Sequence, residues 1–303
     1  MTAPSPRLVR QLELLPTSDV CQRWRERKAR WYRDHADAPR LDPRRYFVEP
    51  ISQAAAAAWL AQHHYLRTLA GRQWLYGLID EQTSDADAAL VGIAVFGPGM
   101  PNVLPALFPG LRANEDSTEL LHFGLLDAVP ANGESHFLAA AFSRLVREGV
   151  VAVVSFSDPV VRWRADGRIV APGHVGTCYA AGGATYTGRT APVTYRIFPD
   201  DAALLHPRML AKYRAGDPNA RGLELALVAH GAPPRALDDD PARYLDRLLP
   251  RVTQPFRHGG LHRYAFTLGP HARAIRIARP ALPYPRRLPA GGSTPVRCIG
   301  AQP

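Results

Sequence analysis

Cysteine and lysine are scarce in this sequence of 303 residues, and long apolar runs are missing. The three cysteines, Cys21, Cys178 and Cys298, lie far apart without a CxxC pair, which argues against a disulfide framework and against a structural zinc site. No stretch approaches the ~18 apolar residues of a membrane span, and the first residues lack the apolar core of a signal peptide. We therefore expect a protein of the reducing cytoplasm that is neither secreted nor inserted into a membrane.

Arginine supplies nearly all of the positive charge, because Lys28 and Lys212 are the only lysines among 37 basic residues. With 27 acidic residues the formal net charge is +10. The planar guanidinium pairs bidentately with phosphate and with guanine edges, so this charge favours nucleic acid as a partner. A surface that only improves solubility is the alternative. At 46% hydrophobic residues, the chain can form one large domain or two modest ones.

Residues 1–45 are expected to form a basic helical arm that ends in a linker. The segment 21–45 carries nine Lys/Arg residues with Trp24, Trp31 and Tyr32 between them. Phosphate binding combined with aromatic stacking is one interpretation of this pattern. A solvated helix whose aromatic side chains pack on the core is the other.

Residues 46–199 alternate between strand and helix patterns and are expected to form the catalytic core. The expected elements are a strand at 46–52, a helix at 53–64, a hairpin of 74–80 with 89–99, a strand at 117–127, a helix at 130–149, a strand at 150–158, a loop to 172, a short helix within 173–182, and a hairpin of 184–190 with 193–198. This order predicts an α/β fold in which helices flank a mixed central sheet.

The region 117–158 follows the strand–helix–strand plan of the Gcn5-related acetyltransferase (GNAT) fold. The start of its helix could hold an acyl-CoA pyrophosphate, since unpaired amides and the helix dipole favour anions. The candidate cofactor-binding residues are Leu126, Asn132, Gly133 and Tyr179. The alternatives are an ordinary helix capped by Asn132 and a Tyr179 that only packs in the core.

Several blocks together resemble one family. They are AQHHYL (61–66), LVGIAVFGPG, TELLHFGLLDAVPANGESHFLAAAF, SFSDP, GHVGTCYAAGGATYTGRT, HPRMLAKYR, LHRYAF and LPYPRR. In this order they look like the phage Mom family, DNA-modifying proteins with a GNAT-like fold. Its members convert adenine in duplex DNA to a carbamoylmethyl derivative and so protect the DNA from restriction. The resemblance covers roughly residues 46–290 and implies that this chain is a transferase acting on double-stranded DNA.

The resemblance implies four catalytic residues: His64, Tyr65, Ser135 and Asp158. It also implies acetyl-CoA and a metal ion, iron, as possible cofactors, with His64, Tyr65 and Asp158 as candidate metal ligands. Asp158 follows a strongly apolar strand, which places a carboxylate at the usual ligand end of an α/β sheet. There it could accept an adenine amino proton or bind a metal ion.

Structural alternatives exist for the other three residues. His64 could cap its helix, and Tyr65 could pack in the core. Ser135 could cap the following helix, and no GxSxG turn surrounds it. A further histidine, His122, lies within a predicted strand, and we interpret it as a hydrogen-bonded histidine of the sheet.

Residues 200–290 are expected to form a basic C-terminal extension that contacts DNA, and residues 291–303 a disordered tail. Within the C-terminal extension, the stretch 261–287 contains six arginines and no acidic residue. The candidate DNA-binding residues are His206, Arg208, Lys212, Arg214, Arg263, Arg286 and Arg287.

Three functions are compatible with these patterns. The leading hypothesis is a phage or prophage enzyme of the bacterial cytoplasm that modifies the exocyclic amino group of adenine in DNA. The second is an N-acyltransferase that acts on a small amine or a protein. The third is a DNA-binding relative that has lost its activity.

Overall fold

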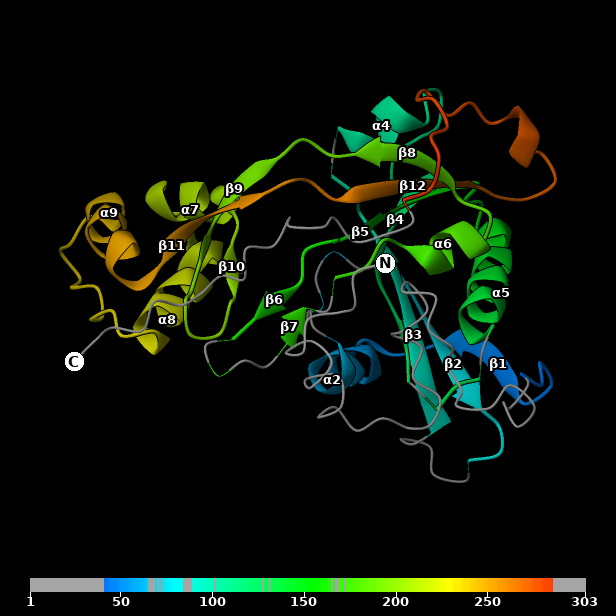
Figure 1. Cartoon of the computed structure of the whole chain (residues 1–303), viewed down its shortest axis with the longest axis horizontal. Coiled ribbons are helices and arrows are strands. Elements are labelled where there is room, and N and C mark those ends of the chain that lie inside the picture. The colour runs from blue at the N-terminus through cyan, green and yellow to red at the C-terminus, as the bar shows by residue number, and fades with distance from the viewer. Residues whose placement is uncertain are drawn as a thin grey trace, which may run out of the picture. The chain divides into compact units, whose positions relative to one another are not determined.

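The computed structural model describes residues 41–64, 69, 71, 73–83, 89–100, 102–126, 128–130, 132–164, 166, 169–171 and 173–285. They divide into two compact units (Figure 1). The described parts of Met1–Pro159, His174–Thr190 and Leu261–Leu288 form unit 1, and those of Val160–Gly173 and Ala191–Gly260 form unit 2. The predicted basic arm before residue 41 and the predicted disordered tail lie outside the described residues.

Unit 1 is built on a seven-stranded sheet in the order β1-β2-β3-β4-β5-β12-β8. The strands are β1 (Tyr46–Pro50), β2 (Trp74–Asp80), β3 (Leu90–Gly97), β4 (Ser117–Leu125), β5 (Ala152–Ser157), β12 (His262–Thr267) and β8 (Thr185–Arg189). β4 and β5 pair in parallel, and the other neighbours in this sheet are antiparallel. The predicted α/β class with a mixed central sheet is confirmed.

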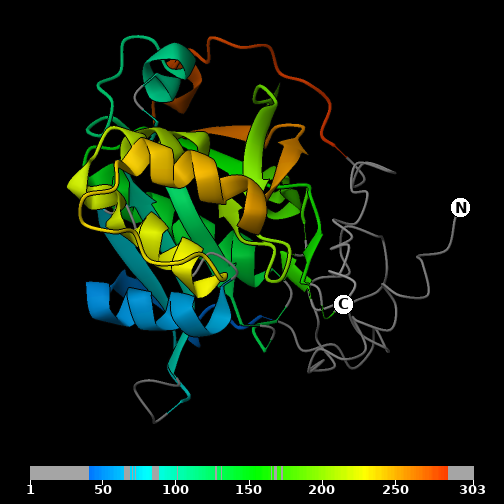
Figure 2. The same cartoon turned by 90° about the vertical axis from the view of Figure 1, so that its left-hand side faces the viewer.

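The two longest helices of unit 1 cover opposite faces of this sheet. Its helices are α2 (Gln53–His63), α4 (Val103–Leu107), α5 (Gly133–Arg147), α6 (Thr177–Ala181) and the 3-10 turn η3 (Ala272–Ala274). Successive residues of β3 point to opposite faces, so that Val95 packs with Trp59 of α2 while Phe96 packs with Phe142 of α5. Figures 1 and 2 show α2 in blue on one side of the strands.

α5 packs closely from its first residue. Its buried residues Leu138, Ala141, Phe142 and Leu145 recur at helical spacing, which is the predicted pattern. Asn132 occupies the predicted N-cap position in a left-handed conformation, but its side chain makes no capping hydrogen bond. A Cβ atom at Gly133 would lie 2.5 Å from Val129 Cγ1, so only glycine fits where the helix begins.

The predicted hairpin of 184–190 with 193–198 is wrong, although both strands exist. β8 pairs with β12 in unit 1, whereas β9 (Val193–Ile197) pairs with β11 (Gln254–His258) in unit 2. The predicted loop before residue 172 contains the short strands β6 (Arg162–Trp163) and β7 (Ile169–Ala171). The strands that pair with β8 and β9 lie far away in the sequence, and a local sequence pattern does not reveal such pairing.

Unit 2 has its own small sheet and helices. β9 lies between β11 and β10 (Leu204–Leu205), and the helices are α7 (Pro207–Arg214), the 3-10 turn η2 (Pro218–Ala220), α8 (Arg221–Ala229) and α9 (Pro241–Val252). Its core includes Phe198, Leu223, Tyr244 and Leu248. Of the helices in the described residues, none combines the length and apolar character needed to cross a membrane.

Glu119 is a half-buried acid of the central sheet. It lies on β4, opposite Gly97 of β3 and Val154 of β5. Burial raises the pKa of Glu119 to about 7, against a lowering by a hydrogen bond from the Met100 backbone. Folding therefore favours the protonated carboxyl.

This shift predicts a pH-dependent stability. Because the folded-state pKa of Glu119 is raised, stability contributed by its protonated form falls as pH rises from about 4.5 to about 7. Glu119→Gln should raise the free energy of unfolding by about 1–3 kcal/mol at pH 8 and change it little at pH 4.5. Urea unfolding at both pH values measures this. The exposed Glu49→Gln is the control, and an equal effect of Glu119→Gln at both pH values would contradict the prediction.

The close packing at Gly133 predicts a second stability effect. Gly133→Ala should destabilise the protein by about 1–3 kcal/mol, because the new methyl group has no space beside Val129. Gly222 lies in α8 with nothing within 4 Å of its Cβ position, so Gly222→Ala should stabilise its helix by about 0.5–1 kcal/mol. Thermal unfolding followed by circular dichroism compares the two. A melting temperature of Gly133→Ala equal to that of the wild type would refute this packing argument.

Candidate functional site

The central sheet opens between its two parallel strands. β4 and β5 are in register from Ser117 with Ala152 to Leu120 with Ser155. Beyond that point β4 continues to Leu125 along β3, and β5 continues to Ser157 along β12. A bulge in the β3–β4 register, where Leu121 is the extra residue, coincides with the separation. The opening therefore lies at the carboxyl ends of two adjacent strands, where α/β sheets commonly bind ligands.

The start of α5 follows β4 through a short turn. Leu126 donates its backbone N–H to Val91 O, Val129 donates to Leu126 O, and Gly133 donates to Pro130 O. Ser135 is half-buried in the first helical turn, and Asn132 is exposed. The predicted cofactor residues Leu126, Asn132 and Gly133 thus lie between the end of β4 and the first turn of α5, which also contains Ser135. The first amides of such a helix can bind an anion.

His64 lies against the far end of β4. It caps α2 with its N–H donated to Leu60 O, and its ring stands edge-on to His122 at 5.4 Å between centroids. A Cβ at Gly124 would be 3.0 Å from Trp59 Cη2 and 3.5 Å from His64 Cδ2, so glycine here makes room mainly for the Trp59 ring. The adjacent catalytic candidate, Tyr65, lies outside the described residues.

His122 does not fit its interpretation as a fully hydrogen-bonded histidine. Its Nδ1 atom is buried and has no hydrogen-bond partner among the described residues. Burial lowers the pKa of His122, which keeps the ring neutral at pH 7. The position of His122 within a strand indicated a structural role. Among the described residues, its ring contact with His64 connects it to the candidate site.

Asp158 lies where β5 ends, as predicted. Its backbone carbonyl accepts a 2.7 Å hydrogen bond from the N–H of His174. Burial lowers the pKa of His174 to about 4, and the charge of Asp158 acts in the opposite direction. No local sequence pattern indicates His174, because the long loop between the two residues hides their proximity.

Tyr179 joins this group from α6. It is buried, and its ring lies 6.2 Å from that of His174 and 5.3 Å from that of Tyr264 on β12. The hydroxyl of Tyr264 donates to Val175 O. Tyr179 therefore packs in the core, and its ring lies beside that of His174.

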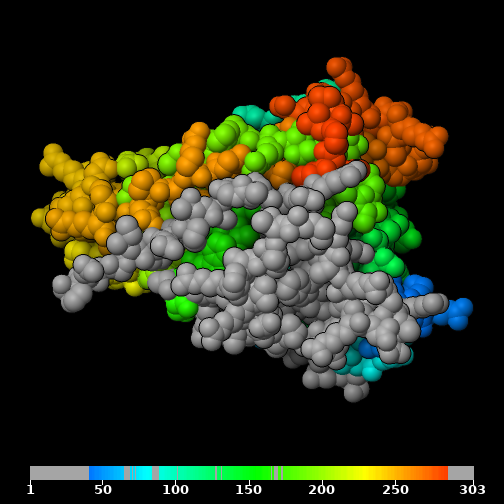
Figure 3. All heavy atoms as spheres, in the orientation of Figure 1, coloured from blue at the N-terminus to red at the C-terminus, as the bar shows by residue number. Residues whose placement is uncertain are grey.

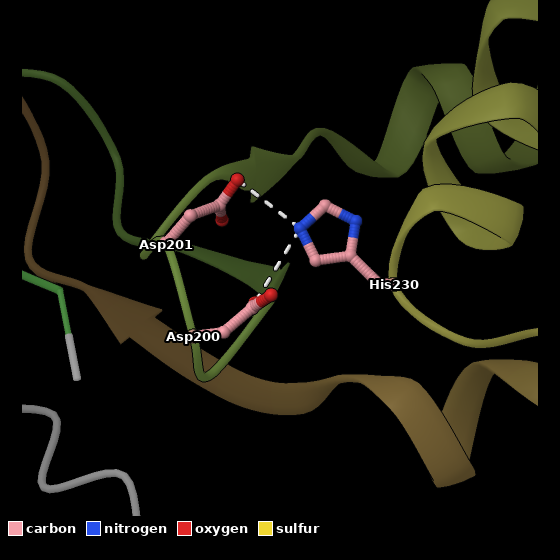
Figure 4. Close-up of side chains that lie close together, drawn as sticks. All are labelled: Asp200, Asp201 and His230. Atoms are coloured by element: carbon pink, nitrogen blue, oxygen red, sulfur yellow. Dashed lines mark ion pairs between the residues drawn. The ribbon is translucent and has the colours of Figure 1, made fainter.

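The candidate metal ligands His64, Tyr65 and Asp158 stay a prediction, because Tyr65 lies outside the described residues. The three-ligand group found among the described residues lies in unit 2, where His230 Nε2 is 3.4 Å from Asp200 and 3.1 Å from Asp201 (Figure 4). His230 Nδ1 contacts Ala226 O at 2.7 Å, and its ring stacks on Phe198. These contacts join the β9–β10 turn to α8. We assign no step of the reaction to a metal ion.

The predicted DNA-binding residues of α7 differ in their surroundings. His206 caps the helix by accepting from the N–H of Arg208, whose side chain is exposed. Lys212 lies 3.5 Å from Asp217, and Arg214 lies 2.7 Å from Asp246. Arg208 is therefore the more available of these cations for phosphate.

Arg263 is not on a contact surface. It is 8% exposed on β12 and donates to Thr187 Oγ1 at 2.9 Å and to Thr187 O at 2.8 Å. Burial lowers its pKa. The exposed arginines of the same stretch are Arg273, Arg276 and Arg279, in the segment that follows β12 and is drawn in orange to red in Figure 3. Arg286 and Arg287 lie outside the described residues.

Comparison with solved structures gives weak likenesses to acetyltransferases. A GNAT-family N-acetyltransferase (YhbS) from Escherichia coli, solved in complex with CoA, is 16% identical with a TM-score of 0.27, over 41% of this chain and 68% of that one. A tandem GNAT protein from the clavulanic acid biosynthesis pathway is 11% identical with a TM-score of 0.36, over 74% and 99% of the two chains. TM-scores this low do not establish a shared fold or function.

Comparison of the sequence identifies the family. No curated protein sequence matches the chain significantly. The model of the Mom protein family matches residues 45–286, which include β1 to β12, the opening between β4 and β5, and Asp158. This chain belongs to the Mom protein family.

Proposed function

We propose that this protein is a transferase that modifies the exocyclic amino group of adenine in double-stranded DNA, by carbamoylmethylation. The modification would protect DNA from restriction in the cytoplasm of a bacterial host. Membership of the Mom family supports the reaction class. The observation that carries the proposal is the position of Asp158, a carboxylate at the carboxyl end of β5 where β4 and β5 separate.

Asp158 is suited to proton transfer. The adenine amino group is a weak nucleophile and loses one N–H proton as the new C–N bond forms, so a nearby carboxylate that accepts this proton favours the reaction. His64, Tyr65 and Ser135 complete the proposed catalytic set. Iron is implied by the family resemblance alone, and these roles do not depend on it.

The start of α5 is suited to an acyl-CoA donor. Gly133 lets the chain enter α5 close to Val129, and its own N–H donates to Pro130 O, so we assign the pyrophosphate to later amides of the first helical turn. Acetyl-CoA alone supplies neither the nitrogen of a carbamoylmethyl group nor a leaving group on its methyl carbon, so the reaction from acetyl-CoA also requires a nitrogen source and a two-electron oxidant, with CoA as the leaving thiol. Leu126, Asn132 and Tyr179 complete the proposed cofactor site.

An enzyme that acts on a base in duplex DNA must hold the phosphates while the base is extruded. We assign phosphate contacts to Arg208 of α7, with His206 beside it, and to the exposed Arg273, Arg276 and Arg279 of unit 1. Arg286 and Arg287 continue this arginine-rich segment in the sequence.

A second candidate function is acyl transfer to a small amine or a protein. The observation that favours it is the neutralisation of Lys212 and Arg214 by Asp217 and Asp246, which reduces the positive charge that α7 offers to DNA. An inactive DNA-binding relative would bind DNA without forming product. Acetyl-CoA turnover without DNA binding would identify the acyltransferase.

The proposed reaction predicts a modified nucleoside that depends on Asp158. Plasmid DNA from bacteria expressing the wild type should contain a deoxyadenosine heavier by a carbamoylmethyl group, detected by mass spectrometry of the nucleosides. Asp158→Asn keeps the shape of the side chain but removes the proton acceptor, so the product should fall at least about 100-fold. The exposed Asp238→Asn should leave it unchanged. Unmodified DNA from folded wild-type protein would reject the proposal.

The proposed phosphate contact predicts a salt-dependent effect. Arg208→Ala should weaken binding to duplex DNA equally for all sequences, and the slope of log K against log salt should decrease by about 1 in magnitude. Arg112→Ala, which removes an exposed arginine already paired with Asp116, is the control. Fluorescence anisotropy at several salt concentrations measures both. Identical slopes for Arg208→Ala and the wild type would place the contact elsewhere.

A further inference from the structure

Three polar atoms near the opening are buried without partners. They are Ser155 Oγ, Ser157 Oγ and His262 Nε2, and none has a hydrogen bond to another described residue. The exposed fractions of the three residues are 0%, 1% and 6%. Burying an unpaired polar group is unfavourable, and native proteins retain few such groups. A group that binds there would offset this cost.

The three atoms belong to one side of two neighbouring strands. His262 of β12 pairs directly with Ser157 of β5, and Tyr264 pairs with Ser155. Directly opposed residues in an antiparallel pair have Cβ atoms about 5 Å apart on the same face. Residues two apart in a strand also share a face. The two hydroxyls and the imidazole therefore form a single cluster.

The His262 ring is held in place by its other nitrogen. Nδ1 lies 2.7 Å from the hydroxyl of Tyr186 on β8, and this contact leaves Nε2 for another partner. Burial lowers the pKa of His262 to about 4, with further lowering by Arg189 and His174. The imidazole is therefore neutral at pH 7, like the two hydroxyls. The cluster suits an uncharged ligand better than a phosphate or a carboxylate.

The cluster lies at the end of β5, where this strand separates from β4. Ser155 is the last residue of β5 in register with β4, so Ser157 lies beyond the point of separation. Ser157 directly precedes Asp158 in the chain. A ligand bound by the cluster would lie beside the opening between the strands.

We propose that Ser155, Ser157 and His262 hydrogen-bond the edge of the acceptor base and position its amino group for the reaction. This inference rests on the proposed function. A nucleobase is uncharged and presents both donors and acceptors along its edge. Hydroxyls can donate or accept, and a neutral imidazole nitrogen does one or the other according to its tautomer. The three residues thus act as binding and positioning residues in addition to the four catalytic ones.

The experiment compares folding with function in single serine variants. Ser157→Ala and Ser155→Ala remove hydroxyls that make no bond within the described protein, so their melting temperatures should equal or exceed that of the wild type. Adenine modification should fall at least about 10-fold in Ser157→Ala. Thr118→Val is the matched control, since its buried hydroxyl already donates to Gly97 O at 2.9 Å and its loss should lower the melting temperature. Should Ser157→Ala not fold, the near-isosteric Ser157→Cys replaces it.

A second readout separates this inference from the proposed function. Millimolar adenosine should raise the melting temperature of the wild type and not that of Ser157→Ala. If the wild type leaves DNA unmodified but adenosine still stabilises it through Ser157, the proposed reaction fails and the base-binding cluster stands. If Ser157→Ala and Ser155→Ala melt below the wild type and modify DNA at the wild-type rate, the hydroxyls are structural and the inference is overturned. An adenosine effect that is absent, or unchanged in Ser157→Ala, also overturns it.

Discussion

The short parallel pairing between β4 and β5 is the contact on which the candidate site depends. It extends only from Ser117 with Ala152 to Leu120 with Ser155. Each strand then follows its other neighbour, because β3 holds β4 and β12 holds β5 through further antiparallel pairs. Beyond the separation, the ends of β4 and β5 each keep hydrogen bonds to an outer neighbour but form no ladder with each other. Asp158 and the turn before α5 follow directly from these ends.

Burial sets the chemistry around this opening. His122, His174 and His262 all have lowered pKa values because they are removed from water. Neutral imidazoles can donate or accept hydrogen bonds, and the lowered pKa values make these three weaker proton acceptors than an ordinary histidine. Asp158 is consequently the acidic residue that enters the electrostatics of His174. Uncharged polar groups and one carboxylate suit an acceptor that is itself neutral.

The net charge of +10 overstates the cations available to a nucleic acid. Lys212 and Arg214 have acidic partners, and the buried guanidinium of Arg263 donates hydrogen bonds to Thr187. Exposed arginines remain on α7 and after β12. Composition therefore indicates a class of partner, but burial and ion pairing decide which arginines could contact it.

Local patterns determined much of unit 1 from the sequence alone. The spacing of apolar residues located α2, β2, β3, α5 and β5, and the end of β5 placed Asp158, since periodicity depends only on neighbouring residues. Strand partners depend instead on residues far along the chain. Tyr186 and His262 are 76 residues apart, and only the tertiary structure brings them together, along with His174, and buries Arg263. Burial and long-range pairing follow from packing of the whole unit, which no local pattern encodes.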